Sequence, residues 1–167
     1  NSAADLHNDM SDDIKIMLRE YRLALKRNNN KKDFRFMNYG YIDSDPPDLE
    51  PDDEPYRLFI QLYEMNIRDA QLNDKEVLEV GSGRGGGASW IAKSLHPSSL
   101  VGVDFSSEAV SLCHNWYNHQ KNLKFIEFPK YGLEELKKIT KNCFSLKTLN
   151  HGQQMFQAGQ TRTRKYH

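Results

Sequence analysis

Apolar residues recur every three or four positions in two stretches of the first half of the chain, residues 11–25 and 56–67. This spacing is typical of helices that bury one face. Between the two stretches lie an aromatic segment, residues 34–41, and a stretch rich in Asp and Pro, residues 43–55, which predicts a loop. Residues 1–73 are therefore expected to form a helical and aromatic N-terminal region.

From residue 74 onward, short apolar runs alternate with amphipathic stretches. The strands are expected at 77–80, 100–103 and 123–126, and the helices between them at 87–95 and 106–120. Strands that alternate with helices in this way are typical of a parallel sheet. The pattern predicts an α/β unit over residues 74–128.

The pattern weakens after Phe128. One short helix is expected over 132–140, whereas residues 151–167 are polar, basic and without periodicity. No further buried strand is expected. Residues 129–167 are interpreted as a divergent basic tail.

Composition narrows the possible classes of protein. The chain has 167 residues, of which 28% are charged and 38% hydrophobic, as in one globular domain. No run approaches the ~20 apolar residues of a membrane span, and no signal peptide is visible, so a cytoplasmic setting without a transmembrane segment is expected. The basic residues that predominate at the end of the chain are scattered, so no nucleic-acid partner is expected.

The two cysteines, Cys113 and Cys143, lack metal-ligand spacing. They are interpreted as reduced structural thiols, and no metal site is expected.

A glycine-rich stretch follows the first expected strand, where residues 77–88 read V-L-E-V-G-S-G-R-G-G-G-A. Glycines allow the backbone to turn at positive φ and a ligand to approach it closely. The stretch satisfies G-x-G-x-x-G, and Asp104 ends the next expected strand, so a dinucleotide site of an oxidoreductase is one interpretation. Tight packing between strand and helix is another.

Glu79 favours a different cofactor. It lies two positions before Gly81, where dinucleotide sites usually carry an apolar residue, and an acidic group there is the pattern of S-adenosylmethionine sites. That cofactor has a cationic amino-acid end and a ribose but no phosphate. Glu79 can supply negative charge near the cationic end, and Asp104 can accept both ribose hydroxyls. Gly81, Gly83 and Gly85 would let the cofactor lie against the main chain.

Three segments together resemble small-molecule class I methyltransferases, closest to the phthiotriol/phenolphthiotriol dimycocerosates methyltransferase group. They are residues 78–89 (L-E-V-G-S-G-R-G-G-G-A-S), 101–106 (V-G-V-D-F-S) and 36–41 (F-M-N-Y-G-Y). The resemblance covers about residues 34–127. It implies a Rossmann-like core, S-adenosyl-L-methionine as cofactor and a small-molecule or lipid acceptor.

The resemblance also implies roles for individual residues. The expected cofactor-binding residues are Glu79, Val80, Gly81, Ser82, Gly83, Gly85, Asp104 and Phe105, with Tyr39 and Tyr41 in a lid over the cofactor. Core packing is the alternative role for the two tyrosines.

No catalytic base is identified in the sequence. The three histidines of the α/β unit, His96, His114 and His119, are interpreted as surface or packing residues, and Trp90 and Trp116 as core.

Two elements that the resemblance implies after the third strand are not found: an acidic residue that contacts adenine, and a fourth strand. The chain is therefore interpreted as a Rossmann-like core truncated after its third parallel strand. An exposed edge on the strand 77–80 would then favour self-association. The expected function is an S-adenosylmethionine-dependent methyltransferase, and the alternative is a non-catalytic half-domain that binds cofactor or a partner.

Overall fold

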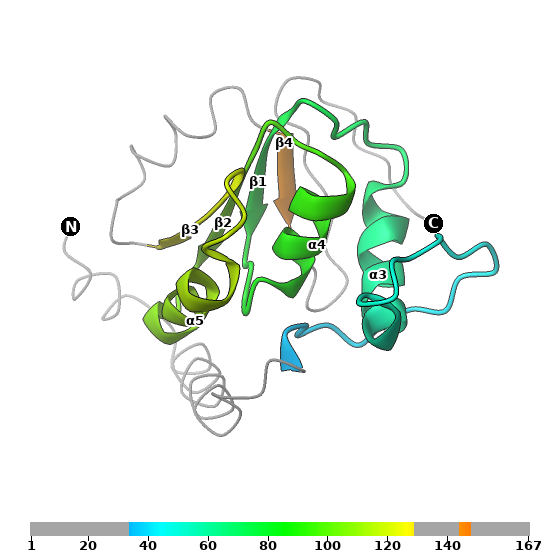
Figure 1. Ribbon diagram of the computed structural model, residues 1–167, viewed down its shortest axis with the longest axis horizontal. Helices are drawn as coiled ribbons and strands as arrows, with labels where there is room; N and C mark the ends of the chain where they lie inside the picture. Colours follow the sequence, from blue (N-terminus) through cyan, green and yellow to red (C-terminus); the bar gives the residue numbers. More distant parts are fainter. Residues whose placement is uncertain (1–33, 129–143, 148–167) are drawn as a thin grey trace, which may run out of the picture.

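The computed structural model describes residues 34–128 and 144–147, which form a parallel four-stranded sheet covered by helices (Figure 1). The strands are β1 (Glu76–Val80), β2 (Ser99–Asp104), β3 (Leu123–Glu127) and β4 (Phe144–Lys147). The helices are α3 (Arg57–Ile67), preceded by the 3₁₀ turn η2 (Glu54–Tyr56), α4 (Gly86–Ser94) and α5 (Ser107–Tyr117). The strand order is β3-β2-β1-β4. The Rossmann-like α/β fold expected from the sequence is thereby confirmed.

The fourth strand corrects one expectation. β4 pairs in parallel with β1, with Leu78 opposite Ser145, while the other edge of β1 pairs with β2, with Leu78 opposite Val101. The sheet therefore does not end after its third strand, and the edge of β1 is not open for self-association. The physical reason is that backbone N–H and C=O groups along an apolar strand need partners, which the returning chain supplies.

Both crossover helices lie on one face of the sheet. Figure 1 shows α4 and α5 in front of the strands and α3 beside α4. A right-handed crossover from β1 to β2 and another from β2 to β3 place their helices on the same side. Val77, Leu100 and Phe125 line this face and belong to the main core. Leu78 and Val103 form a second, smaller cluster with Val101 and Phe128.

The helices match the sequence pattern closely. Tyr56, directly before α3, and Ile60 and Ile67 within it are buried, as the apolar stripe predicts. The third helix, α5, ends at Tyr117, before the predicted end at residue 120. Its first turn is capped by Ser106, whose Oγ accepts a hydrogen bond from the N–H of Ala109 at 3.2 Å.

The two tryptophans pack as expected. Trp90 is buried in the main core, and Trp116 is half-buried against it. The expected helices at 11–25 and 132–140, and Cys143, lie outside the described residues. Within residues 34–128 and 144–147, no helix has both the length and the apolar character needed to cross a membrane. The cytoplasmic setting stays a prediction.

Candidate functional site

The turn between β1 and α4 depends on glycines with positive φ. Gly81, Gly83 and Gly85 have φ values of +80°, +55° and +76°. The N–H groups of Gly81 and Ser82 both donate to the carbonyl of Val103, at 2.8 and 3.0 Å. The turn is thus held against the end of β2, at the carboxyl ends of the strands, where open α/β sheets bind their ligands.

Two of these glycines have different surroundings. A Cβ atom on Gly81 would meet no atom of residues 34–128 within 4 Å, whereas one on Gly85 would lie 2.7 Å from the Phe125 ring and 2.9 Å from the Cys113 sulfur. The interpretation of tight packing therefore applies to Gly85. At Gly81 the backbone borders open space, as close approach by a ligand requires.

Asp104 lies beside the turn at the end of β2. Its Oδ2 accepts a hydrogen bond from the N–H of Gly83 at 2.7 Å, and its Oδ1 accepts one from Ser106 at 2.9 Å. Burial raises the pKa of this carboxyl, and the backbone hydrogen bonds oppose that effect. Each carboxylate oxygen has a second lone pair, so Asp104 keeps the capacity to accept the ribose hydroxyls expected from the sequence.

Glu79 is fully buried in the middle of the sheet, on the same face as Val77. The hydroxyl of Tyr63 on α3 donates a hydrogen bond to its Oε1 at 3.0 Å. Tyr63 lies within the apolar stretch 56–67, whose pattern predicted only a helix with one buried face. The missed signal was the residue type, since a tyrosine within an apolar stripe brings a hydroxyl that needs a partner.

The aromatic segment is attached to the same turn. The carbonyl of Arg35 accepts a hydrogen bond from Gly86 at 3.2 Å. Phe36 is buried, and its ring packs against Tyr56 at a centroid distance of 5.4 Å. In Figure 1 the segment, drawn in blue, passes the end of the sheet at which α4 begins and leads toward α3.

Tyr39 and Tyr41 are not the core residues of this segment. Their side chains are 84% and 40% exposed, and the core position is occupied by Phe36. The N–H of Tyr41 donates to the carbonyl of Leu58 at 2.8 Å, so the segment lies along α3. Their role as a lid stays a prediction.

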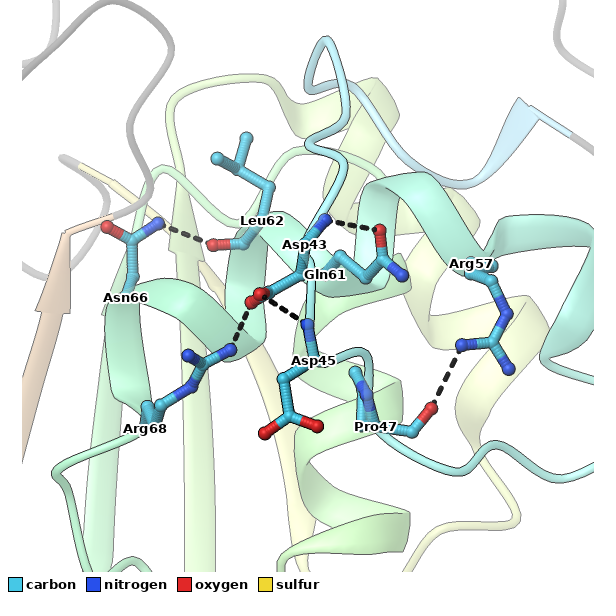
Figure 2. A network of polar contacts seen from close by, with 8 residues as sticks. All are labelled: Asp43, Asp45, Pro47, Arg57, Gln61, Leu62, Asn66 and Arg68. Carbon is cyan, nitrogen blue, oxygen red and sulfur yellow. Dashed lines mark hydrogen bonds and ion pairs between the residues drawn. The ribbon is translucent and has the colours of Figure 1, made fainter.

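The following loop is fastened to α3 by polar contacts (Figure 2). The Asp43 N–H donates to Gln61 Oε1 at 3.3 Å, and its carboxylate accepts a hydrogen bond from the Arg68 guanidinium. A second guanidinium, that of Arg57, donates to the carbonyl of Pro47 at 2.9 Å. These contacts fasten residues 43–47, the first part of the loop, to one helix, so the aromatic segment and α3 form one packed unit.

The remaining predicted site residues also lie at the strand ends. Val80 and Phe105 are exposed, and the Phe105 ring meets that of Phe128 edge-on at 5.2 Å between centroids. Ser82 is buried, and its hydroxyl has no hydrogen-bond partner within the described part of the chain. The structure therefore brings Val80, Ser82 and Phe105 to the carboxyl ends of β1 and β2, close to Glu79 and Asp104.

The three histidines and Cys113 lie in surroundings that are typical of surface or packing residues. A ring nitrogen of His114 lies 2.9 Å from the Phe125 carbonyl, and His96 and His119 are exposed in loops. Cys113 is a free, buried thiol whose sulfur lies 3.5 Å from the Gly83 carbonyl. Burial raises the pKa of this thiol, and the nearby acidic groups of Asp104 and Glu79 raise it further.

The chain is similar to several proteins of known class. The family described as a methyltransferase domain matches residues 77–162. A fatty-acid O-methyltransferase of Mycolicibacterium smegmatis is 37% identical over 125 residues, which are 73% of this chain and 43% of that protein. A phthiotriol/phenolphthiotriol dimycocerosates methyltransferase of Mycobacterium tuberculosis is 42% identical over 80 residues, 47% of this chain and 30% of that one.

One similar solved structure is an S-adenosylmethionine-dependent methyltransferase of Thiobacillus denitrificans in complex with S-adenosyl-L-homocysteine. It has a TM-score of 0.40 and 16% sequence identity, and the match covers 64% of this chain and 36% of that one. This chain spans less than half of the length of the two curated relatives. The match of the methyltransferase domain, however, extends over just over half of the 167 residues. The chain therefore belongs to the class I S-adenosylmethionine-dependent methyltransferase family.

Proposed function

We propose that this chain binds S-adenosylmethionine at the turn between β1 and α4, as part of an enzyme that methylates a small molecule or lipid. The observation that carries the proposal is the open space beside Gly81, which has a positive φ and, in the part of the chain that the structure describes, no neighbouring atom at its Cβ position. An acidic residue lies on each side of this turn, Glu79 in β1 and Asp104 at the end of β2.

The chemistry of the flanking residues supports this cofactor. Glu79 is a buried acid near the turn, which suits the cationic amino-acid end of S-adenosylmethionine and not the phosphates of a dinucleotide. Asp104 suits the ribose hydroxyls. The cofactor supplies an activated methyl group on its sulfonium, so the protein's contribution is to hold the donor and acceptor in line.

An acceptor with an apolar chain is supported by the surface of the aromatic segment, whose Arg35 carbonyl accepts a hydrogen bond from Gly86 at the start of α4. Exposed apolar side chains gather where the aromatic segment lies along α3; they are Tyr39, Tyr41, Ile42 and Leu58. The two relatives are named for fatty-acid and phthiotriol dimycocerosate methylation. We therefore propose that the methyl acceptor is a lipid rather than a polar molecule.

Calorimetric titration with S-adenosyl-L-homocysteine tests the cofactor site. At the positive φ of Gly81, Asn is tolerated better than Ala, so weaker binding by Gly81→Asn would come from its larger side chain in the proposed cofactor space and not from backbone strain. We expect Gly81→Asn to bind at least about tenfold more weakly than Gly81→Ala. Equal affinities in the two variants, or no saturable binding to the parent chain, would contradict the proposal.

Methyl transfer is tested in a separate experiment with methyl-labelled S-adenosylmethionine and a long-chain fatty acid. We expect label in the lipid fraction and its loss in Gly81→Asn. Saturable cofactor binding without transfer to any lipid would instead favour the non-catalytic alternative.

A further inference from the structure

We propose that Tyr63 is a positioning residue for the cofactor, because its hydroxyl holds the Glu79 carboxylate in the orientation that receives the cationic end of S-adenosylmethionine. This inference rests on the proposed function of the turn. It assigns to α3, a helix before the α/β unit, a direct part in shaping the cofactor site.

The first support is the contact itself. The Tyr63 Oη atom lies 3.0 Å from Glu79 Oε1. Glu79 is fully buried, and a buried carboxylate that lacks hydrogen-bond donors is strongly destabilising. A neutral hydroxyl donor stabilises the carboxylate without cancelling its charge. A carboxylate has several acceptor sites, so Glu79 can accept this hydrogen bond and also bind a cationic ligand.

The second support is that the tyrosine ring is held in place. A Cβ atom on Gly87 would lie 1.9 Å from Tyr63 Cζ and 2.3 Å from its Oη. The ring thus packs directly on the backbone of the first turn of α4. On another side it meets the Phe36 ring edge-on at 6.1 Å between centroids. These contacts restrict the ring, and therefore the position of its hydroxyl.

The third support is the place of these contacts in the chain. Tyr63 belongs to α3, Phe36 to the aromatic segment, and Gly87 to the helix that follows the glycine turn. The segment also bonds to this helix through the Arg35 carbonyl and the N–H of Gly86. Glu79 is therefore oriented by the same packed unit that carries the predicted lid, which couples cofactor binding to the placement of that unit.

Tyr63→Phe tests the role by removing one oxygen and keeping the ring. We expect its affinity for S-adenosyl-L-homocysteine, measured by calorimetry, to fall about tenfold. Tyr56→Phe is the matched control, because Tyr56 is buried at the start of the same helix and also packs against Phe36. The control should bind the cofactor as the parent chain does.

A double-mutant cycle separates positioning from a general loss of structure. If Tyr63 acts through Glu79, Tyr63→Phe should weaken binding in the parent chain but not in Glu79→Gln. An unchanged affinity in Tyr63→Phe, or an equal loss in both backgrounds, would overturn the inference and leave the proposed function intact. A parent chain that does not bind the cofactor would overturn the proposed function, and this role with it.

A second measurement covers the case in which Tyr63→Phe does not fold. Incorporation of 3-fluorotyrosine at position 63 keeps the ring and its hydroxyl. We expect its fluorine resonance to shift as S-adenosyl-L-homocysteine is added to saturation. A resonance that does not change while the cofactor binds would overturn the positioning role.

Discussion

The carboxylate of Asp104 accepts a hydrogen bond from the backbone N–H of Gly83, with 2.7 Å between Oδ2 and N. Its other oxygen accepts one from the N–H of Ser106, the residue that caps α5. A single side chain at the end of β2 therefore ties the glycine turn to the start of the next helix. Asp104 has this structural part in addition to the ribose binding that we propose for it.

The raised pKa of Asp104 predicts a pH dependence of stability. The folded chain keeps the proton on this carboxyl at pH values above 3.8, the ordinary value for an aspartate, at which the unfolded chain already loses it. Between these two pKa values the folded state binds more protons, so this group's contribution to the free energy of unfolding falls as pH rises. Chemical denaturation at a series of pH values measures this fall.

Asp104→Asn is the control for that experiment, because it keeps the size of the side chain and removes its titration. We expect the free energy of unfolding of the parent chain, minus that of the variant, to decrease with pH just above 3.8. A difference that rises over this range would mean that hydrogen bonding outweighs burial and lowers the pKa of Asp104.

Gly87→Ala should destabilise the fold, although glycine-to-alanine changes within a helix ordinarily stabilise it. The added methyl group would lie 1.9 Å from Tyr63 Cζ, so the ring and the start of α4 must separate. We expect a loss of about 1 to 3 kcal/mol in the free energy of unfolding, measured by urea denaturation. Ser89→Ala, two residues further along the same helix and half-buried, is the control and should change stability little. A more stable Gly87→Ala variant would refute the close packing of Tyr63.

Cys113 should be unreactive in the folded chain. Its thiol is buried and its pKa is raised by that burial, so the reactive thiolate is scarce at neutral pH. We expect iodoacetamide at pH 8 to leave Cys113 unmodified under native conditions and to modify it fully in 6 M guanidinium, as measured by peptide mass spectrometry. Rapid modification in the native chain would show that the space between α5 and the glycine turn opens readily.

Local sequence patterns predicted most of the described elements. The strands β1, β2 and β3 and the helices α3, α4 and α5 were expected from hydrophobic periodicity, with shifts of a few residues at their ends. These elements alternate strongly between apolar and polar positions, and glycines or a serine cap mark their starts. β4 was missed because it has only four residues and lies in a basic, polar stretch of the chain. An alternation of apolar and polar residues over so short a run does not distinguish a strand from a loop.

The sequence by itself determined the family, the glycine turn and the acids Glu79 and Asp104, since these depend on residue types at fixed spacing along one stretch of chain. Only the tertiary structure decided that β4 pairs with β1, that Gly85 serves packing while Gly81 borders open space, and that Tyr63 contacts Glu79. Each of these joins residues that are not neighbours along the chain. Such contacts follow from how the helices pack on the sheet and from the need of buried polar groups for partners, neither of which periodicity records.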